Sequence, residues 1–395
     1  MLPVEEAVSH ILSKAKTLKP ETVAIEDTQH RALSTPIRSS MDMPPFDNSA
    51  MDGIAIRFED RNDTLVLQGT IACGSKRPAP LNTKHAYKIM TGAPLPEGAD
   101  TVVAKEDILI ENDTVTVQCD VRHGQHIRQK GSDIKENDFL FDVGTKIDVG
   151  VQALLASLGN THIQSYSVPK VAVLSTGDEL VHYSQTPKWG QIRNTNNLLL
   201  CNLIRSLGIE PTDLGSVGDN LPDTVSAIKR GLEFDVIITT GGVSVGEFDF
   251  VKQAIEEAKI QLEFWKVAMK PGKPVVYGSH PNGSHFFGLP GNPGSAFVAF
   301  SLFLRPFLRK LTGQSSPIDQ TIQGVLNQDY TKKPGRSHFL RAQLDTTTDT
   351  PVFDISGPQG SGSLLSLCDV DALVHIPAEL LAIDKKTMVK AILLK

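Results

Sequence analysis

The chain has 395 residues, of which 40% are hydrophobic and 21% charged, and a formal net charge of −6. This length favours roughly two to four domains. The acidic balance argues against a general nucleic-acid binder, because phosphate contacts require an excess of Lys and Arg. The sequence contains no apolar stretch of about 18 residues and no signal-peptide pattern at its start, so we expect a cytoplasmic protein that does not span a membrane. Its four cysteines lie far apart without a zinc-binding spacing, which favours free thiols.

The first half of the chain indicates a β-rich module inserted into a frame. Apolar residues of "VEEAVSHILSKA" (4–15) recur at helical spacing and predict an amphipathic helix that packs on a domain or a second subunit. Residues 46–132 alternate in short runs broken by Gly, Pro and Asn-Asp turns, which predicts the inserted β-rich domain. Residues 1–45 and 133–168 flank it, and we expect them to form one elongated domain for dimerisation.

The second half changes to apolar strands that alternate with amphipathic helices. Over 169–316 this pattern predicts an α/β domain with a doubly wound, mostly parallel sheet. Residues 317–395 return to strand-like runs, which predict a small, barrel-like C-terminal β domain. The predicted fold class is therefore multi-domain, α/β plus β.

Three loops rich in glycine and polar residues follow predicted strands of the α/β domain. They are "LSTGDEL" (174–180), "TTGGVSVGEFDF" (239–250) and "GLPGNPGS" (288–295). Ligands of such sheets bind outside the carboxyl ends of the strands, so we expect the three loops to converge on one binding site.

The residue types in these loops suit an anionic ligand. Gly241, Gly242 and Gly246 allow the backbone to turn and to approach an anion closely. A further loop, "MKPGKP" (269–274), supplies two lysines. Hard carboxylates beside phosphate commonly share Mg²⁺. The acidic residues expected at this edge are Asp178, Glu179, Asp219, Glu247 and Asp249.

The second loop also matches another chemistry, since Gly242-x-Ser244-x-Gly246 is the nucleophile elbow of serine hydrolases. Chain order leaves a catalytic triad open, because several acids and histidines follow Ser244. The histidines are His280, His285, His338 and His375. The lysines and repeated carboxylates nearby favour phosphate and metal binding over hydrolysis. The chain lacks GxxxxGK[ST] and an opening GxGxxG, which argues against a P-loop NTPase and an ordinary dinucleotide-binding domain.

Taken in order, the motifs resemble those of the molybdopterin molybdenumtransferases, of the MoeA and gephyrin E-domain type, over essentially the whole chain. Besides the loops above, the resemblance rests on "PPFDNSAMDGIAIR" (44–57), "IMTGAPLPEGAD" (89–100), "IRQKGSDI" (127–134), "WKVAMKPGKP" (265–274) and "PGRSHFLR" (334–341). It implies insertion of molybdate into adenylylated molybdopterin, with Mg²⁺-dependent release of AMP. It also implies a homodimer with the active site between subunits, and a molybdopterin adenylyltransferase and molybdoenzyme maturation proteins as partners.

The resemblance assigns roles to residues of the α/β and C-terminal domains. Positions around the nucleotide phosphates and metal are Asp178, Glu179, Asp219 and Asp249, with Asp178 and Asp249 as metal ligands. The cradle for the phosphates comprises Thr176, Gly177, Gly241, Gly242, Ser244 and Gly246. The positions assigned to molybdate and its adjoining loop are Lys270, Lys273, Pro290, Pro293, Ser295 and Arg336, with Ser361 near the same pocket.

In the β module and its border, the resemblance selects Asp52, Thr91, Arg128 and Asp133, which would reach the partner subunit's α/β domain. With Glu179 and Asp219, the residues Asp52, Thr91 and Asp133 form the expected catalytic set. From spacing alone, ordinary turn chemistry is the better explanation of "MDG" and "TGAP", and only the resemblance favours a functional role.

Three departures from the usual family motifs stand out. Ile54 replaces a tyrosine, Gly294 replaces a valine, and Asn194 replaces an aspartate often found before "TN". The stretch "RQKGSD" also removes charge beside Arg128. Two alternatives stay open: the related molybdopterin adenylyltransferase, and a non-catalytic dimeric scaffold of the gephyrin E-domain type.

Overall fold

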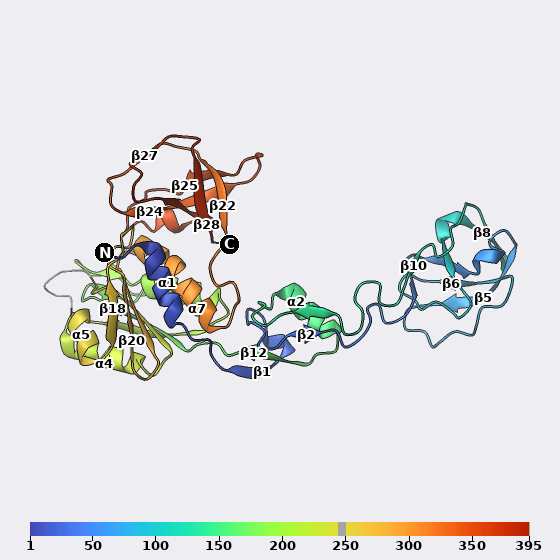
Figure 1. Cartoon of the computed structure of the whole chain (residues 1–395), viewed down its shortest axis with the longest axis horizontal. Helices are drawn as coiled ribbons and strands as arrows, with labels where there is room; N and C mark the ends of the chain where they lie inside the picture. Colours follow the sequence, from blue (N-terminus) through green and yellow to red (C-terminus); the bar gives the residue numbers. More distant parts are fainter. Residues whose placement is uncertain (244–249, 395) are drawn as a thin grey trace. The chain divides into compact units, whose positions relative to one another are not determined.

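The computed structural model describes residues 1–243 and 250–394. The chain divides into two compact units (Figure 1). The larger unit comprises Met1–Thr35, Val143–Leu154 and Asn160–Lys395, and the smaller unit comprises Pro36–Asp142 and Leu155–Gly159. The finer division into four domains stays a prediction. No helix in the described part of the chain combines the length and the apolar character that a membrane span requires.

The smaller unit is built around a six-stranded sheet of order β7-β4-β6-β5-β9-β8. Alternate residues of β4 pack into different apolar clusters: Ile54 and Ile56 lie in one, and Ala55 in the other. The strands are β4 (Gly53–Ile56), β5 (Leu65–Ile71), β6 (His85–Ile89), β7 (Thr101–Ala104), β8 (Ile108–Glu111) and β9 (Thr114–Val117). Since Ile54 is fully buried, it replaces the family's tyrosine with an apolar core contact.

Two short antiparallel pairs complete the smaller unit. Strand β3 (Asn48–Ser49) pairs with β10 (Ile127–Arg128), and β2 (Ile37–Arg38) pairs with β11 (Phe139–Phe141). Helix α2 (Val149–Ser157) contributes residues to both units.

The larger unit begins with α1 (Val4–Lys14), which confirms the predicted amphipathic helix: Val4, Ala7 and Ile11 are buried. Strand β1 (Pro20–Ala24) then pairs antiparallel with β12 (His162–Tyr166).

The main sheet of the larger unit has the order β16-β13-β17-β21-β20-β18. Its strands are β13 (Val171–Thr176), β16 (Pro211–Val217), β17 (Val236–Thr240), β18 (Gln261–Trp265), β20 (Val276–Ser279) and β21 (His285–Leu289). Strands β16, β13, β17 and β21 are parallel neighbours, whereas β20 is antiparallel to both β21 and β18. The sheet is therefore mixed, with one reversed strand.

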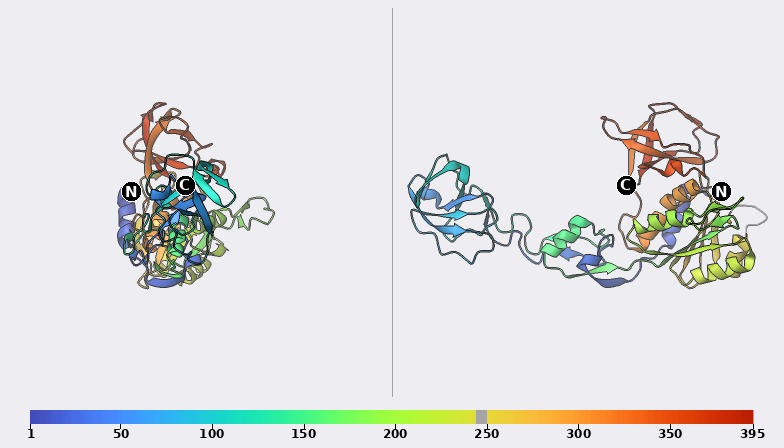
Figure 2. Two further views of the ribbon diagram at one scale, coloured as in Figure 1. Left: turned by 90° about the vertical axis from the view of Figure 1, so that its right-hand side faces the viewer. Right: turned by 180° about the vertical axis from the view of Figure 1, so that it is seen from behind.

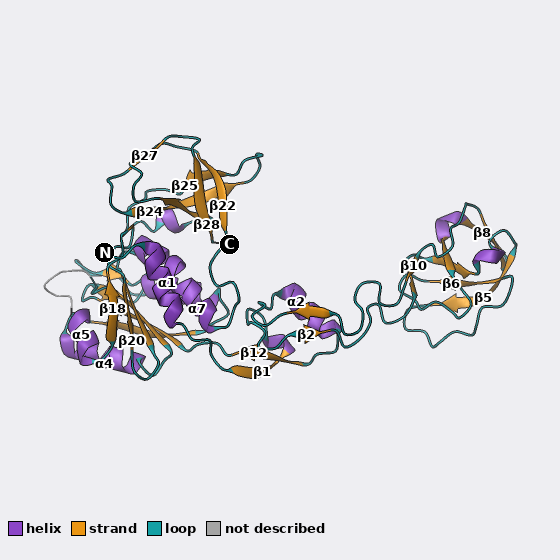
Figure 3. Cartoon of the chain, viewed as in Figure 1, coloured by secondary structure: helices purple, strands orange, loops and turns teal. Residues whose placement is uncertain are grey.

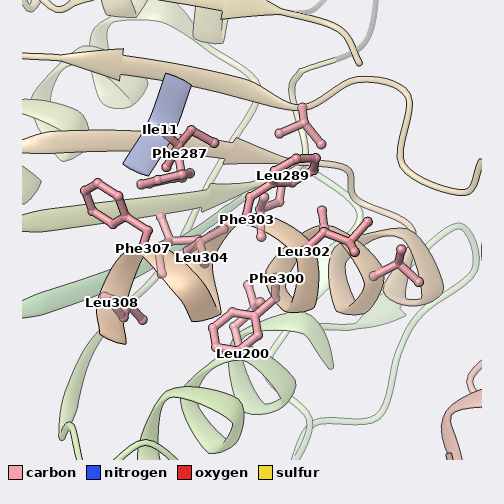
Figure 4. Packing of buried hydrophobic residues seen from close by; sticks show 14 of the residues in the cluster. Ile11, Leu200, Phe287, Leu289, Phe300, Leu302, Phe303, Leu304, Phe307 and Leu308 are labelled. Atoms are coloured by element: carbon pink, nitrogen blue, oxygen red, sulfur yellow. The ribbon is translucent and has the colours of Figure 1, made fainter. Parts of the chain in front are cut away.

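Helices cover both faces of this sheet. Successive side chains of each buried strand point to opposite faces, so each strand contributes to two cores. Val236 and Ile238 of β17 face a core with α1, α3 and the helices after β21, while Ile237 faces a second core with α4 and α5. Figure 4 shows Ile11, Phe287, Leu289 and aromatic residues of the helices after β21 in the first core. The helices are α3 (Asn196–Arg205), α4 (Leu221–Gly231), α5 (Val251–Glu257), α6 (Pro293–Ala299) and α7 (Arg305–Leu311), with π-helical Phe300–Leu304 between α6 and α7.

The C-terminal strands close into a barrel, which confirms the predicted barrel-like domain (Figures 2 and 3). The ring runs β24-β25-β22-β28-β26 and returns to β24. Its strands are β22 (Thr321–Leu326), β24 (Ser337–Asp345), β25 (Val352–Ile355), β26 (Ala372–Ile376) and β28 (Met388–Leu393). A further strand, β19 (Met269–Lys270), pairs in parallel with β24 and so ties the lysine loop to the barrel.

Candidate active site

The three strand-end loops surround one cavity of about 330 Å³ in the larger unit. Strands β13, β17 and β21 are parallel neighbours, so their carboxyl ends deliver these loops to the same edge. The lining residues are Ser175, Thr176, Gly177, Glu179, Leu180, Ile192, Arg193, Asn194, Thr195, Asn196, Asp219, Thr240, Gly241, Gly242, Gly291 and Pro293. Ser244, Gly246, Glu247 and Asp249, which the sequence also assigned to this site, lie outside the described residues.

The turn after β17 requires glycine. Gly241 and Gly242 have φ of +93° and +60°, a region that side chains other than glycine disfavour. A Cβ at position 241 would lie 2.5 Å from the carbonyl oxygen of Thr176. A Cβ at position 242 would lie 2.8 Å from the Thr176 hydroxyl. The backbone therefore passes directly over Thr176 at the cavity.

Four polar residues in the described cavity lining are almost completely buried: Ser175, Thr176, Asn196 and Thr240. The Asn196 Nδ2 group donates to the Thr240 hydroxyl at 2.9 Å and to the Gly291 carbonyl at 2.7 Å. These bonds tie the start of α3 to the ends of β17 and β21. The sequence analysis considered Asn194 and missed Asn196, whose buried position at the start of α3 could be recognised only after the helix was placed.

Asn194 keeps a structural role in place of the family's aspartate. Its Oδ1 accepts from the backbone N–H of Asn197 in the first turn of α3 at 3.3 Å. An acceptor near a helix N-terminus stabilises the first turn. The substitution therefore retains the oxygen that an aspartate would place there, without its charge.

The described carboxylates lie near the cavity but do not complete a metal site. Glu179 and Asp219 line it, and the backbone N–H of Asp219 donates to Asp178 Oδ1 at 2.9 Å. Their oxygens are of the type that Mg²⁺ prefers. Within residues 1–243 and 250–394, however, no three His, Cys, Asp or Glu side chains come together as a metal site. The described residues therefore do not by themselves fit a bound Mg²⁺.

A second cavity of about 400 Å³ is strongly cationic. Its lining residues are Lys270, Thr331, Lys332, Lys333, Pro334, Arg336 and His338. The β19–β24 pairing sets Lys270 opposite His338 and close to Arg336. The sequence motifs did not assign Lys332, Lys333 or His338 to an anion site, although the run "TKKPGR" (331–336) precedes β24.

His338 is a neutral group in this cationic cavity. Its Nδ1 lies 2.8 Å from the Tyr330 hydroxyl. Burial, together with the charges of Lys270, Lys332 and Arg336, lowers the pKa of His338 to about 4. Lys332 has a structural role, because its Nζ donates to the carbonyls of Arg336 and Ala378, each at 3.0 Å.

Lys273 does not share this lining with Lys270. It is exposed, and its carbonyl accepts from the backbone N–H groups of Val267 and Val275. The two lysines are separated because Lys270 belongs to β19, whereas Lys273 follows the turn. The lining of this cavity therefore includes Lys270 but not Lys273, and the assignment of both to one anion site stays a prediction.

The loop after β21 connects the first cavity with the barrel. The Pro290 carbonyl accepts from the Thr240 hydroxyl at 3.1 Å, and Pro293 begins α6 in the cavity wall. The N–H of Gly294 donates to the Ser361 carbonyl at 2.9 Å. A Cβ at position 294 would lie 2.8 Å from that oxygen, so a valine here would require the segment at Ser361 to shift. Ser295 is buried and its N–H donates to the Asn292 carbonyl.

In the smaller unit, Asp52 and Thr91 form one polar pair. Asp52 Oδ1 accepts from the N–H of Thr91 at 2.8 Å and from its hydroxyl at 3.0 Å. These hydrogen bonds, first the one from the backbone, lower the pKa of Asp52. Arg128 lies exposed in β10, and the N–H of Asp133 donates to the Met43 carbonyl at 3.0 Å.

The described surroundings of the first cavity give little support to the serine-hydrolase alternative. None of the described residues lining it is a histidine. His285 is half-buried beside Tyr277, whose hydroxyl lies 3.0 Å from its Nδ1, and His375 stacks on Phe339. Ser244 itself lies outside the described residues.

These features are those of a multi-domain α/β protein with a ligand site at the carboxyl ends of parallel strands. Residues 2–159 match the MoeA N-terminal region (domain I and II). Residues 172–310 match a probable molybdopterin binding domain, and residues 323–394 match the MoeA C-terminal region (domain IV). The molybdopterin molybdenumtransferase of Staphylococcus aureus strain Mu50 is 33% identical over 385 residues, covering 95% of this chain and 91% of the relative. That of Staphylococcus epidermidis strain ATCC 12228 is 31% identical over 384 residues, with the same coverage.

Solved structures agree. A molybdopterin biosynthesis MoeA protein from Pyrococcus horikoshii has a TM-score of 0.78 at 30% identity and covers 100% of this chain and 99% of its own. A second, from P. horikoshii OT3, has a TM-score of 0.82 at 27% identity and covers 100% of both chains. The chain belongs to the MoeA family of molybdopterin molybdenumtransferases. This confirms the family and the multi-domain fold inferred from the motifs.

Proposed function

We propose that this protein inserts molybdate into adenylylated molybdopterin, with cleavage of the phosphoanhydride and release of AMP. The observation that supports this most is the pair of complementary cavities in the larger unit. One has a glycine turn and buried polar groups at strand ends, and the other is lined by Lys270, Lys333 and Arg336. Backbone N–H groups of a glycine turn suit phosphate, and fixed cations suit a tetrahedral oxyanion.

In this proposal the chain's residues position two substrates. The turn at Gly241 and Gly242 holds the phosphates of the nucleotide, with Thr176 beneath it. Lys270 and Arg336 hold molybdate, while Lys332 braces the loop through two carbonyls. The β19–β24 pairing places Lys270 opposite His338, two residues after Arg336. Fixing both reactants lowers the entropic part of the barrier.

The proposal also includes Mg²⁺, with Asp178 and Asp249 as its ligands, and magnesium would neutralise charge on the phosphoanhydride. Because the described carboxylates form no three-ligand group, we assign no step to the metal. The same proposal includes a cytoplasmic homodimer, in which Asp52, Thr91, Arg128 and Asp133 contribute to the partner subunit's site. It also includes a molybdopterin adenylyltransferase and molybdoenzyme maturation proteins as partners.

The test is AMP release from adenylylated molybdopterin by the purified chain with molybdate and Mg²⁺. We expect Arg336→Gln to raise the KM for molybdate by at least about tenfold, because a charge-assisted hydrogen bond contributes about 1.5–3 kcal/mol. Lys229→Gln, at an exposed position in the last turn of α4, is the matched variant and should leave it unchanged.

Three results would contradict the proposal. Absence of AMP release by the folded wild type would leave the scaffold alternative. Consumption of ATP with unadenylylated molybdopterin would indicate the adenylyltransferase. Labelling of Ser244 by a serine-directed covalent probe would indicate the hydrolase.

A further inference from the structure

Two buried polar atoms of the first cavity have no hydrogen-bond partner among the described residues: Asn196 Oδ1 and Thr176 Oγ1. Both residues line the cavity, and both are more than nine-tenths buried. A buried acceptor without a donor costs about 1–3 kcal/mol, so native proteins rarely retain one without a reason.

The orientation of the Asn196 amide follows from its partners. The Gly291 carbonyl can only accept, so the group facing it at 2.7 Å must be the NH₂. The Thr240 hydroxyl gives its proton to the Pro290 carbonyl and therefore accepts from the second Nδ2 proton. Both protons of the amide are used, and Oδ1 remains as an acceptor.

This acceptor is selective in what it can bind. Ionised phosphate and molybdate oxygens are themselves acceptors and would repel Oδ1. An N–H or O–H group of a ligand would satisfy it. Thr176 lies beneath the glycine turn, and its hydroxyl can donate to a phosphate oxygen there. The two groups thus suit different parts of one ligand, an anionic part and a neutral part that carries a donor.

We propose that Asn196 Oδ1 accepts a hydrogen bond from the adenosine part of the substrate, either from the 6-amino group of adenine or from a ribose hydroxyl. This inference rests on the proposed function, which places the nucleotide's phosphates at Gly241 and Gly242. Asn196 is then a specificity-determining residue, and it also holds the ends of β17 and β21 together at the site.

The neighbouring residue is a matched control. Asn197 is 4% exposed and is also in the first turn of α3. Its Nδ2 donates to Asp213 Oδ1 at 2.6 Å and to the Gly215 carbonyl at 2.9 Å, and its Oδ1 accepts from Ser175. Its amide is fully used inside the protein. Asn197→Ala should therefore cost stability without changing which ligands are preferred.

The experiment measures binding to the full chain by calorimetry for AMP, inosine monophosphate, 2′-deoxy-AMP and 3′-deoxy-AMP. In the wild type we expect AMP to bind at least about tenfold more tightly than one of the three analogues, which identifies the donor. In Asn196→Ala the affinity for AMP should fall to that of this analogue, so that the preference disappears. In Asn197→Ala the preference should persist.

The inference is overturned if the wild type prefers AMP over none of the analogues, or if Asn196→Ala keeps the full preference. If Asn196→Ala weakens the binding of adenylylated molybdopterin but not the binding of AMP, the donor lies on the pterin and the adenosine assignment is overturned. Circular dichroism of each variant checks folding. If AMP binds with the expected preference but no AMP is released from adenylylated molybdopterin, the proposed function fails while the role of Asn196 stands.

Discussion

At the scale of single residues, the site depends on a close approach between the glycine turn and Thr176. Gly241 combines a positive φ with a Cβ position 2.5 Å from the Thr176 carbonyl oxygen. Gly283, in the larger unit, has a similar φ of +98° but no atom within 4 Å of its Cβ position. Comparing the two separates backbone strain from steric exclusion.

We expect Gly283→Ala to lose about 1 kcal/mol of unfolding free energy through strained φ, and Gly241→Ala to lose more, because its Cβ would also meet the Thr176 carbonyl oxygen. Gly241→Ala should also lose AMP affinity, by tenfold or more, because the turn must move off Thr176. Urea denaturation and calorimetric titration with AMP measure the two effects. Equal AMP affinity in both variants would show that the close approach at Gly241 has no bearing on the ligand.

At the scale of elements, helix α1 is held to the last strand of the sheet by one carboxylate. Glu263 of β18 accepts from Lys14 Nζ at 2.9 Å and from the Ser279 hydroxyl at 3.0 Å, and its Oε2 lies 3.0 Å from His10 Nε2. Burial opposes ionisation of Glu263, but the hydrogen bonds from Lys14, Ser279 and His10 outweigh it and lower its pKa. The carboxylate therefore stays charged beneath the helix.

Replacing Glu263 by Gln should weaken the anchoring of α1. We expect a loss of about 1–3 kcal/mol, since charge-assisted hydrogen bonds at a largely buried site become neutral ones. Hydrogen exchange of residues 4–14 should accelerate in this variant. The exposed Glu256→Gln on α5 is the control and should change stability by less than about 0.5 kcal/mol. Unchanged exchange in α1 would contradict the anchoring.

Local sequence patterns were sufficient to predict the strands and helices, but they did not predict the direction of every strand. The apolar run of β17, which is buried throughout, and the amphipathic pattern of α1 were evident from the residues alone. The reversed strand β20 was missed, although Asn282-Gly283 between β20 and β21 is a hairpin signal. Apolar runs buried on both sides look alike in either direction, so only the turn carries the distinction.

At the scale of the whole molecule, stability should fall in mild acid. Burial lowers the pKa of His285 in the α/β core, and burial with nearby cations lowers that of His338 in the barrel, each to about 4. The unfolded chain titrates histidine near pH 6.5. Between pH 6.5 and 4 the unfolded state therefore binds more protons, and the free energy of unfolding decreases as the pH falls.

From pH 7.5 to 5.5 we expect each of these histidines to remove about 1 kcal/mol of unfolding free energy. Urea midpoints at the two pH values measure the total effect, to which His30 and His375 also contribute because burial lowers their pKa values. His285→Phe should reduce the difference, whereas His162→Gln, at an exposed position, should leave it unchanged. A midpoint that rises on acidification would show that the two imidazoles are not held neutral.

The sequence by itself determined the family, the barrel-like end of the chain and the glycine turns, because motif order, strand patterning and backbone conformation are local properties. Only the tertiary structure decided which side chains share a cavity. Lys270 joins Lys333 and Arg336 through the β19–β24 pairing, whereas Lys273, three residues later, does not. Asn196 became a candidate because its partners, Thr240 and Gly291, come from distant segments. They use both of its amide protons and leave its buried oxygen without a partner among the described residues.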